Sequence, residues 1–120
     1  MINSQFNRNI TRAALLFLVT LVSGISLASA DDIAAGKKVA FDRKKGNCLA
    51  CHMIADGALP GNIGPPLIAM KARYPDKADL RAQIWDPTAA NPNTMMPPFG
   101  KHRILTEKEV DLITEFIYTL

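Results

Sequence analysis

Apolar residues recur along much of this chain at intervals of three and four, which is the spacing of a helix face. This pattern predicts helices over residues 33–45, 76–85 and 105–120, with a shorter one over residues 68–73. Almost no stretch alternates apolar and polar residues as a strand would. Residues 88–101, rich in Pro, Asn and Thr, have no periodicity and predict an irregular loop. We therefore expect an all-α protein.

The helix predicted over residues 105–120 has the clearest start signal. Thr106 followed by Glu109 is a capping box, and Leu105 before it can pack as a hydrophobic staple. We expect the apolar stripe of this helix to pack across the first helix near Gly36. The stripe consists of Val110, Ile113, Phe116, Ile117 and Leu120.

The first predicted helix offers a small residue for such a contact. Asp31 or Asp32 can cap its start, and Gly36 and Ala40 lie on one face with Phe41 beside them. A glycine inside a helix costs about 1 kcal/mol relative to alanine. Gly36 either lets another helix approach closely or is simply tolerated.

Residues 1–30 have the pattern of an export signal. Two arginines precede an uncharged apolar stretch, and small residues follow that end at Ala30 in an A-x-A cleavage site. The alternative is an uncleaved membrane anchor, because residues 13–30 contain no charge. The Ser, Gly and Ala content before Ala30 favours cleavage. We expect a signal peptide over residues 1–30, a domain over residues 31–120, a periplasmic location and no membrane contact after cleavage.

The length of 120 residues corresponds to one domain. The formal net charge of +3 becomes +1 once the two arginines of the signal are removed, which gives no case for nucleic-acid binding. A mature chain of 90 residues is small for a self-sufficient core. We therefore expect a bound prosthetic group to supply apolar mass, and the chain without it to fold poorly.

Residues 48–52 read Cys-Leu-Ala-Cys-His, which is the C-x-x-C-H signature of covalent haem attachment. Two thiols at this spacing can each form a thioether with a haem vinyl group, and His52 can then bind the iron as proximal ligand. A helical turn across these residues would put both sulfurs and the imidazole on one side of the backbone. We expect one haem c, bound through Cys48, Cys51 and His52.

Three other interpretations of the cysteine pair are weaker. A dithiol oxidoreductase requires a βαβ context, and the chain has almost no strand pattern. Zinc requires four ligands, and beyond the two cysteines only His52 and His102 remain. A disulfide between residues three apart would close a very small loop and stabilise little.

The sixth iron ligand is expected in the irregular loop near the C-terminus. Met96 directly precedes a proline pair, so its backbone is restricted and its thioether can be offered to the free face of the iron. Met95 is the neighbour that could take this place or could pack in the core. Pro65, in a stiff Gly-Pro-Pro turn, is our candidate for the carbonyl that accepts the second ring N–H of His52.

The helix predicted over residues 76–85 has Leu80 and Ile84 on its inner face. Trp85 at its end either belongs to the core or touches a haem edge through its indole. His102 lies in a polar turn, and we expect it to be exposed rather than catalytic.

The order of these features over residues 31–120 resembles that of class I c-type cytochromes. The resemblance implies three to five helices wrapped around one covalent haem, with the Pro65 carbonyl on the haem histidine and Met96 as sixth ligand. The first helix departs from the family pattern, in which an aromatic residue lies four positions after the glycine. Here Ala40 occupies that position and Phe41 follows it.

Three stretches resemble one branch of that family more closely, the SoxX subunits of bacterial SoxAX complexes. They are residues 41–47, residues 61–67 and residues 93–100, the last reading Asn-Thr-Met-Met-Pro-Pro-Phe-Gly. This resemblance implies a periplasmic heterodimer with a SoxA-like cytochrome subunit. Such a complex is an L-cysteine S-thiosulfotransferase of thiosulfate oxidation, in which this chain would accept electrons and pass them to a downstream acceptor.

An iron with both axial positions filled by protein has no open position for substrate, so we expect this chain to transfer electrons and not to be catalytic alone. The alternative function is a free periplasmic cytochrome that carries electrons to an oxidase or other redox partner. A stable complex would need an apolar patch beside the haem edge, whereas a shuttle needs only a small interface. Candidate members of such a patch are Met53, Ile63, Met70 and Phe99.

Overall fold

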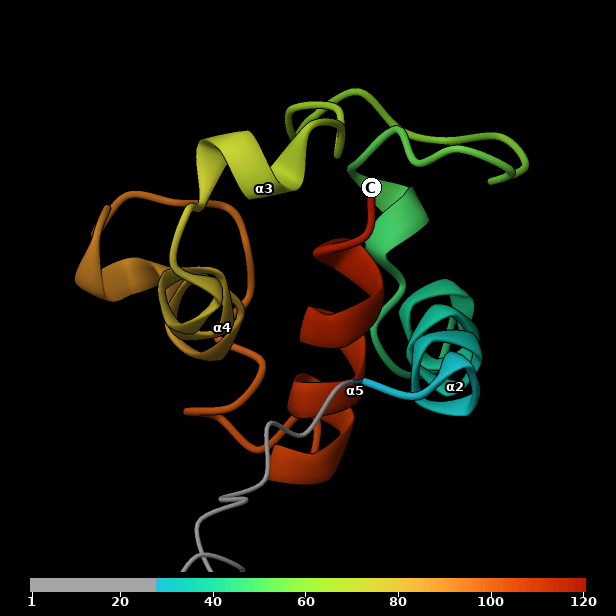
Figure 1. Cartoon of the computed structure of the whole chain (residues 1–120). Helices are drawn as coiled ribbons and strands as arrows, with labels where there is room; N and C mark the ends of the chain where they lie inside the picture. Colours follow the sequence, from blue (N-terminus) through green and yellow to red (C-terminus); the bar gives the residue numbers. More distant parts are fainter. Residues whose placement is uncertain (1–27) are drawn as a thin grey trace, which may run out of the picture.

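The computed structural model describes residues 28–120, and these residues form helices and turns without any strand. The α-helices are α2 (Ala30–Phe41), α3 (Met70–Arg73), α4 (Lys77–Trp85) and α5 (Glu107–Ile117), and two short 3-10 helices are η1 (Cys48–Ala50) and η2 (Pro87–Ala89). Figure 1 shows α5 between α2 on one side and α3 and α4 on the other. The all-α prediction is confirmed. Most of the predicted signal peptide lies outside the described residues.

Helix α2 lies a few residues N-terminal to its predicted position. Ser29 caps it, rather than Asp31 or Asp32, because the Ser29 hydroxyl accepts the backbone N–H of Asp32 at 3.1 Å. At the other end the Asp42 carboxylate accepts the backbone N–H of Lys44 at 2.8 Å, which is a local turn that competes with helical hydrogen bonds. The consecutive basic residues Arg43, Lys44 and Lys45 therefore follow the helix, although the predicted helix over residues 33–45 included them.

Helices α2 and α5 meet at a glycine. A Cβ added to Gly36 would lie 2.0 Å from the backbone oxygen of Leu112, so a side chain here would force the helices apart. Four residues later Ala40 is fully buried, and the ring of Phe41 packs edge-on against Phe116 with ring centroids 5.9 Å apart. Gly36 therefore allows α2 and α5 to approach each other closely, and Phe41 makes the aromatic contact with α5.

Helix α5 begins at the predicted capping box. The Thr106 hydroxyl accepts the backbone N–H of Glu109 at 3.2 Å, and the Glu109 carboxylate accepts the backbone N–H of Thr106 at 3.0 Å. Four members of the predicted stripe are buried, while Leu120 is only partly buried. The four are Val110, Ile113, Phe116 and Ile117.

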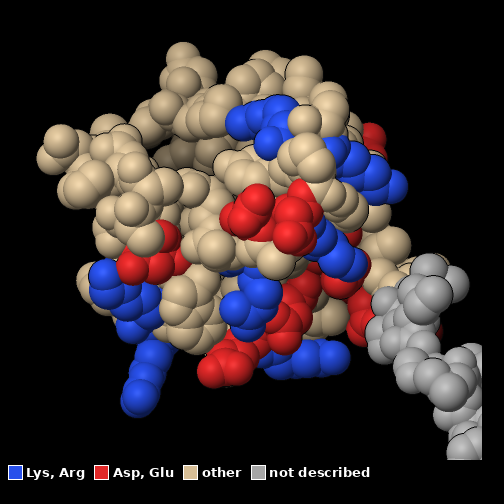
Figure 2. Space-filling model, turned by 60° about the vertical axis from the view of Figure 1, so that its left-hand side comes forward, with Lys and Arg blue, Asp and Glu red and all other residues tan. Residues whose placement is uncertain are grey.

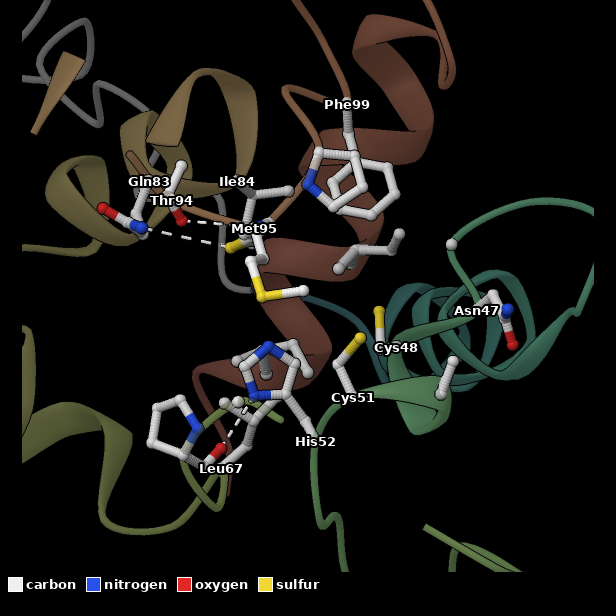
Figure 3. A pocket seen from close by; sticks show the side chains of 18 of the residues that line it. Asn47, Cys48, Cys51, His52, Leu67, Gln83, Ile84, Thr94, Met95 and Phe99 are labelled. Atoms are coloured by element: carbon white, nitrogen blue, oxygen red, sulfur yellow. Dashed lines mark hydrogen bonds between the residues drawn. The ribbon is translucent and has the colours of Figure 1, made fainter. Parts of the chain in front are cut away.

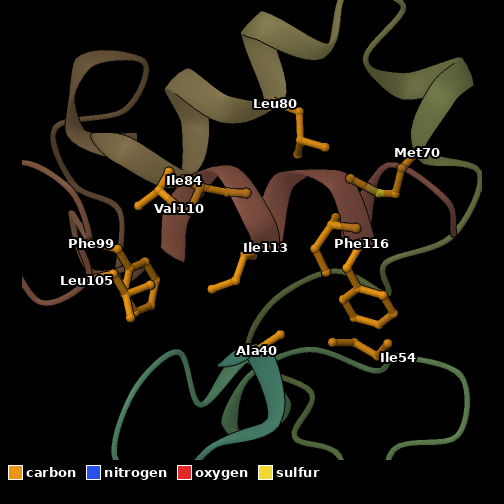
Figure 4. Close-up of a cluster of buried hydrophobic side chains, with 11 residues drawn as sticks. Ala40, Ile54, Met70, Leu80, Ile84, Phe99, Leu105, Val110, Ile113 and Phe116 are labelled. Carbon is orange, nitrogen blue, oxygen red and sulfur yellow. The ribbon is translucent and has the colours of Figure 1, made fainter. Parts of the chain in front are cut away.

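The hydrophobic core surrounds α5 (Figure 4). Leu80 and Ile84, the predicted inner face of α4, are buried on one side of this helix, and Ala40 of α2 lies on the other. Met70 and Phe99 also belong to the core, with exposed fractions of 1% and 8%. The prediction that these two residues form part of an exposed patch is therefore wrong, because packing between distant segments covers them.

Helices α3 and α4 are shorter than predicted. Helix α3 begins only at Met70, because Ala69 has a left-handed backbone with φ of 51° that cannot belong to a right-handed helix. Helix α4 begins at Lys77, and Asp76 caps it by accepting the backbone N–H of Ala78 at 2.8 Å. No helix within residues 28–120 has the length and apolarity needed to cross a membrane.

Candidate functional site

A cavity of about 610 Å³ lies between η1, the turn at residues 63–67, α4, α5 and the loop at residues 91–97. Its walls are mostly apolar, and its volume lies in the range of about 300–1,000 Å³ that is usual for small-molecule and cofactor sites. The predicted site residues all line this cavity. They are Cys48, Cys51, His52, Pro65 and Met96.

The C-x-x-C-H segment presents its three functional groups to one space. The backbone N–H of His52 donates to the carbonyl of Cys48 at 2.9 Å, which closes the predicted helical turn. Figure 3 shows the Cys48 and Cys51 sulfurs and the His52 imidazole facing the same cavity. Two thiols and an imidazole in this arrangement suit a planar ring with two reactive substituents and a central metal.

The His52 ring is held by the proline turn. Its Nδ1 lies 2.7 Å from the carbonyl oxygen of Pro65, and because a carbonyl only accepts, Nδ1 must carry the proton. Nε2 is then left with a lone pair that can bind a metal, as in most metal-binding histidines. The proposed Pro65 acceptor is therefore in place.

Gly64, directly before Pro65, packs against the face of this imidazole. A Cβ added there would lie 2.4 Å from Cε1 and 2.6 Å from Nδ1 of His52. Only a residue without a side chain leaves the ring in its present position. Sequence reasoning assigned no role to Gly64, although its place in the Gly-Pro-Pro turn is a usable signal.

The methionine loop forms the opposite wall. Met96 is half-buried, its backbone N–H donates to the Thr94 hydroxyl at 3.2 Å, and its sulfur lies 3.9 Å from Nε2 of Gln83. Met95 also lines the cavity, across from His52 (Figure 3), with an exposed fraction of 78%. Met95 therefore does not pack in the core. Gln83 was missed from the sequence, where the signal was a polar residue next to the inward-facing Ile84.

The competing interpretations of the cysteines fit this geometry poorly. Burial raises the pKa of the Cys48 thiol to about 11, whereas reactive dithiols have a lowered pKa. The two thiols are not joined in a disulfide. Within residues 28–120, no group of three or more His, Cys, Asp and Glu side chains is arranged to hold a metal ion, whereas a structural zinc site has four ligands.

Trp85 does not line the cavity. Its ring packs on Gly100, where a Cβ would lie 2.0 Å from Cε3, and the Arg81 guanidinium lies 5.3 Å from the ring centroid. Trp85 thus has a packing role. His102 is exposed, as expected.

Residues 33–120 match the family described as Cytochrome c. This chain belongs to the cytochrome c family. It is a class I c-type cytochrome domain with a covalently bound haem c, the cofactor with which this family transfers electrons. Over 76 residues the chain is 34% identical to an uncharacterized lipoprotein of Aquifex aeolicus (strain VF5). This alignment covers 62% of the chain and 37% of the lipoprotein. The cytochrome therefore spans just over a third of the length of this relative.

The surface of this cytochrome has an uneven distribution of charge. On the face in Figure 2, acidic and basic side chains lie next to one another over the lower part, and the hollowed upper left part shows neither. Lys77 pairs with Glu115 and Arg81 with Asp111, each at 2.6 Å. In both pairs a basic side chain of α4 meets an acidic side chain of α5. The apolar residues exposed at the cavity mouth are Ile63, Met95 and Ile104.

Proposed function

We propose that this cytochrome is the electron-accepting subunit of a periplasmic SoxAX-type L-cysteine S-thiosulfotransferase. The observation that carries the proposal is that three segments whose sequences resemble SoxX all contribute residues to the cavity lining. These segments are residues 41–47, residues 61–67 and residues 93–100.

Five residues of the chain would hold the cofactor. Cys48 and Cys51 would form the two thioethers, His52, with its tautomer fixed by Pro65, would bind the iron as proximal ligand, and Met96 would be the sixth ligand. When bound, haem c supplies a one-electron redox couple. A thioether ligand is soft and favours the ferrous state, so Met96 raises the reduction potential. With His52 and Met96 both bound to it, the iron would have no place for a substrate, which fits electron transfer and not substrate activation.

The reaction of the complex explains why a second subunit is needed. Joining a cysteine thiol to thiosulfate forms one S–S bond, breaks the S–H bond, and releases one proton and two electrons. This cytochrome can take one of those electrons at a time. The substrate must therefore bind to a SoxA-like partner, and the second electron must follow after the first has left or go to a centre in that partner.

The surface beside the cavity supports a lasting partner over a free shuttle. Ile63 and Ile104 line the cavity mouth with exposed fractions of 61% and 47%. Met53 follows His52 and Ile68 follows Leu67; these two side chains are 55% and 60% exposed, and their segments meet where the backbone N–H of Leu67 donates to the Met53 carbonyl at 2.9 Å. Exposed apolar side chains gathered at one place are typical of protein interfaces.

Export also belongs to this proposal. The A-x-A sequence ending at Ala30 and the lipoprotein named among the relatives both support a protein that leaves the cytoplasm. Periplasmic delivery would bring the chain to the compartment where two free thiols can be consumed by haem attachment.

The ligand assignment is tested with two matched variants of the holoprotein. Met96→Leu is expected to abolish the methionine–iron charge-transfer band of the oxidised protein, because leucine keeps the volume and removes the sulfur. Met95→Leu is expected to keep the band. A band that survives in Met96→Leu and disappears in Met95→Leu would reverse the assignment.

The partner is tested by reduction of the cytochrome in a mixture of thiosulfate, a carrier protein with a free cysteine, and the SoxA-type subunit of the source organism. We expect reduction that requires every component, and co-elution of the two cytochromes as a heterodimer. Ile63→Lys should slow the reduction about tenfold or more by placing a charge in the interface. Leu59→Lys is the control, because Leu59 is 90% exposed and does not line the cavity. Elution as a single chain with no thiosulfate-dependent reduction would favour the free carrier.

A further inference from the structure

The loop that carries Met96 begins and ends at the same place. The backbone N–H groups of Gly100 and Lys101 both donate to the carbonyl of Trp85 at 3.1 Å, and the Trp85 ring packs on Gly100. Residues 86–99 therefore form a closed surface loop whose two ends lie side by side. The contacts that fix these two ends determine where the loop can place its methionine.

The Asp86 carboxylate joins the two ends. Its Oδ1 accepts the backbone N–H of Thr88 at 3.2 Å and also the Thr88 hydroxyl, while its Oδ2 accepts from the Lys101 ammonium at 2.7 Å. The hydrogen bond from Lys101 holds the pKa of Asp86 below its usual value, so the carboxylate is ionised at neutral pH. The side chain of Asp86 is only 18% exposed, compared with 52% for Asp111 in its pair with Arg81. Water therefore screens the pair at the loop ends less than the pair on the open surface.

The middle of the loop is held by little else. In the part of the chain that the structure describes, the hydrogen bonds of residues 89–97 all stay within residues 86–97, except the contact of Met96 with Gln83. Binding of Met96 to iron has to order this segment, and each ordered residue costs conformational entropy. Ends that are already joined leave less freedom for that binding to remove.

We propose that Asp86 is a positioning residue, which joins both ends of the loop through Lys101 and so keeps small ligands from displacing Met96 at the iron. The inference rests on the proposed role of Met96 as sixth ligand. Displacement of Met96 requires the loop to move, and the ion pair opposes this movement because its two partners lie where the loop departs. Without the ion pair the open form is more populated, and a competing ligand binds more tightly in proportion to that population.

The test is a titration of the ferric holoprotein with imidazole, followed through the methionine–iron charge-transfer band. Asp86→Asn keeps an oxygen to which Thr88 can donate and removes the charge that pairs with Lys101. We expect the imidazole concentration at which half of the band is lost to fall about threefold to fivefold. Lys101→Met should have the same effect, and the double variant should have no larger one, because both substitutions remove one and the same interaction.

Asp111→Asn is the control, because it breaks an ion pair between α4 and α5 that lies outside the loop, and it should leave the titration unchanged. An unchanged titration in Asp86→Asn overturns the proposal, and so does an equal change in Asp111→Asn, which would reflect only general destabilisation. If Asp86→Asn does not fold, Lys101→Met decides, since it leaves the contacts between Asp86 and Thr88 in place.

The band in Met96→Leu separates this proposal from the ligand assignment. Loss of that band together with an unchanged titration in Asp86→Asn overturns the role of Asp86 alone, whereas survival of the band overturns the ligand assignment and the role of Asp86 together. The titration uses no partner subunit, so a failure of the partner experiment leaves its result intact.

Discussion

The contact between Gly64 and His52 gives the sharpest prediction about redox tuning. A Cβ in Gly64→Ala would lie 2.4 Å from Cε1 and 2.6 Å from Nδ1 of the imidazole. Gly64 does not have a positive φ, so alanine introduces no backbone strain and the clash is its main effect. The ring must move by about 1 Å to restore ordinary contact. A movement of that size breaks the 2.7 Å hydrogen bond from Nδ1 to Pro65.

Loss of that hydrogen bond should raise the reduction potential. A donated Nδ1–H makes the imidazole more basic, which favours ferric iron, so its removal favours ferrous iron. The net strength of a neutral hydrogen bond is about 0.5–1.5 kcal/mol, which for one electron corresponds to an upward shift of about 20–65 mV. Spectroelectrochemical titration of the holoprotein measures this shift directly.

Gly57→Ala is the matched control. Its Cβ would lie 2.2 Å from a methyl group of Leu49, so it also clashes with a flexible side chain of the same region but leaves His52 untouched. We expect Gly57→Ala to lower the unfolding free energy and to leave the potential unchanged. Equal potentials in wild type and Gly64→Ala, or equal shifts in both variants, would refute the reasoning.

Three further predictions concern stability. Gly36→Ala should lower the unfolding free energy by about 1–3 kcal/mol, because the added Cβ would meet the α5 backbone. Thermal or denaturant unfolding measures this change. A gain in stability would mean that the two helices can move apart without cost. The hydrogen bond from Lys45 holds the pKa of Glu109 below its usual value, so this pair stabilises the fold above about pH 4.3 and loses its effect as pH falls through the lowered pKa. Glu109→Gln keeps a capping box but removes the charge that pairs with Lys45. Its loss of unfolding free energy relative to the wild type should therefore be present at neutral pH and shrink in acid. A loss that does not depend on pH would contradict the ion-pair account. The double variant Cys48→Ala, Cys51→Ala should lack covalent haem, which leaves the large cavity without its ligand. We expect calorimetry to show no cooperative unfolding of this variant. A sharp unfolding transition would disprove the dependence of folding on haem.

The local structure of several segments could be predicted from the sequence. The C-x-x-C-H turn, the capping box at Thr106 and the proline-restricted Met96 each depend on residues a few positions apart. Such short-range hydrogen bonds and dihedral limits act within one segment, so they do not need knowledge of the fold. The stiff Gly-Pro-Pro turn made Pro65 the candidate acceptor for His52, the resemblance to class I cytochromes implied the same contact, and the structure contains it.

The tertiary structure alone decided which side chains meet across the cavity. Met70 and Phe99 looked like candidates for a surface patch, yet packing from distant segments buries them. Gln83 reaches the Met96 sulfur from another element, and Gly36 has its role only because Leu112 lies opposite. Burial and contact at such positions depend on how helices pack, and the periodicity of one segment does not specify its neighbours. The sequence by itself therefore determined the covalent haem motif and the helices, and the packing around α5 determined what surrounds the iron site.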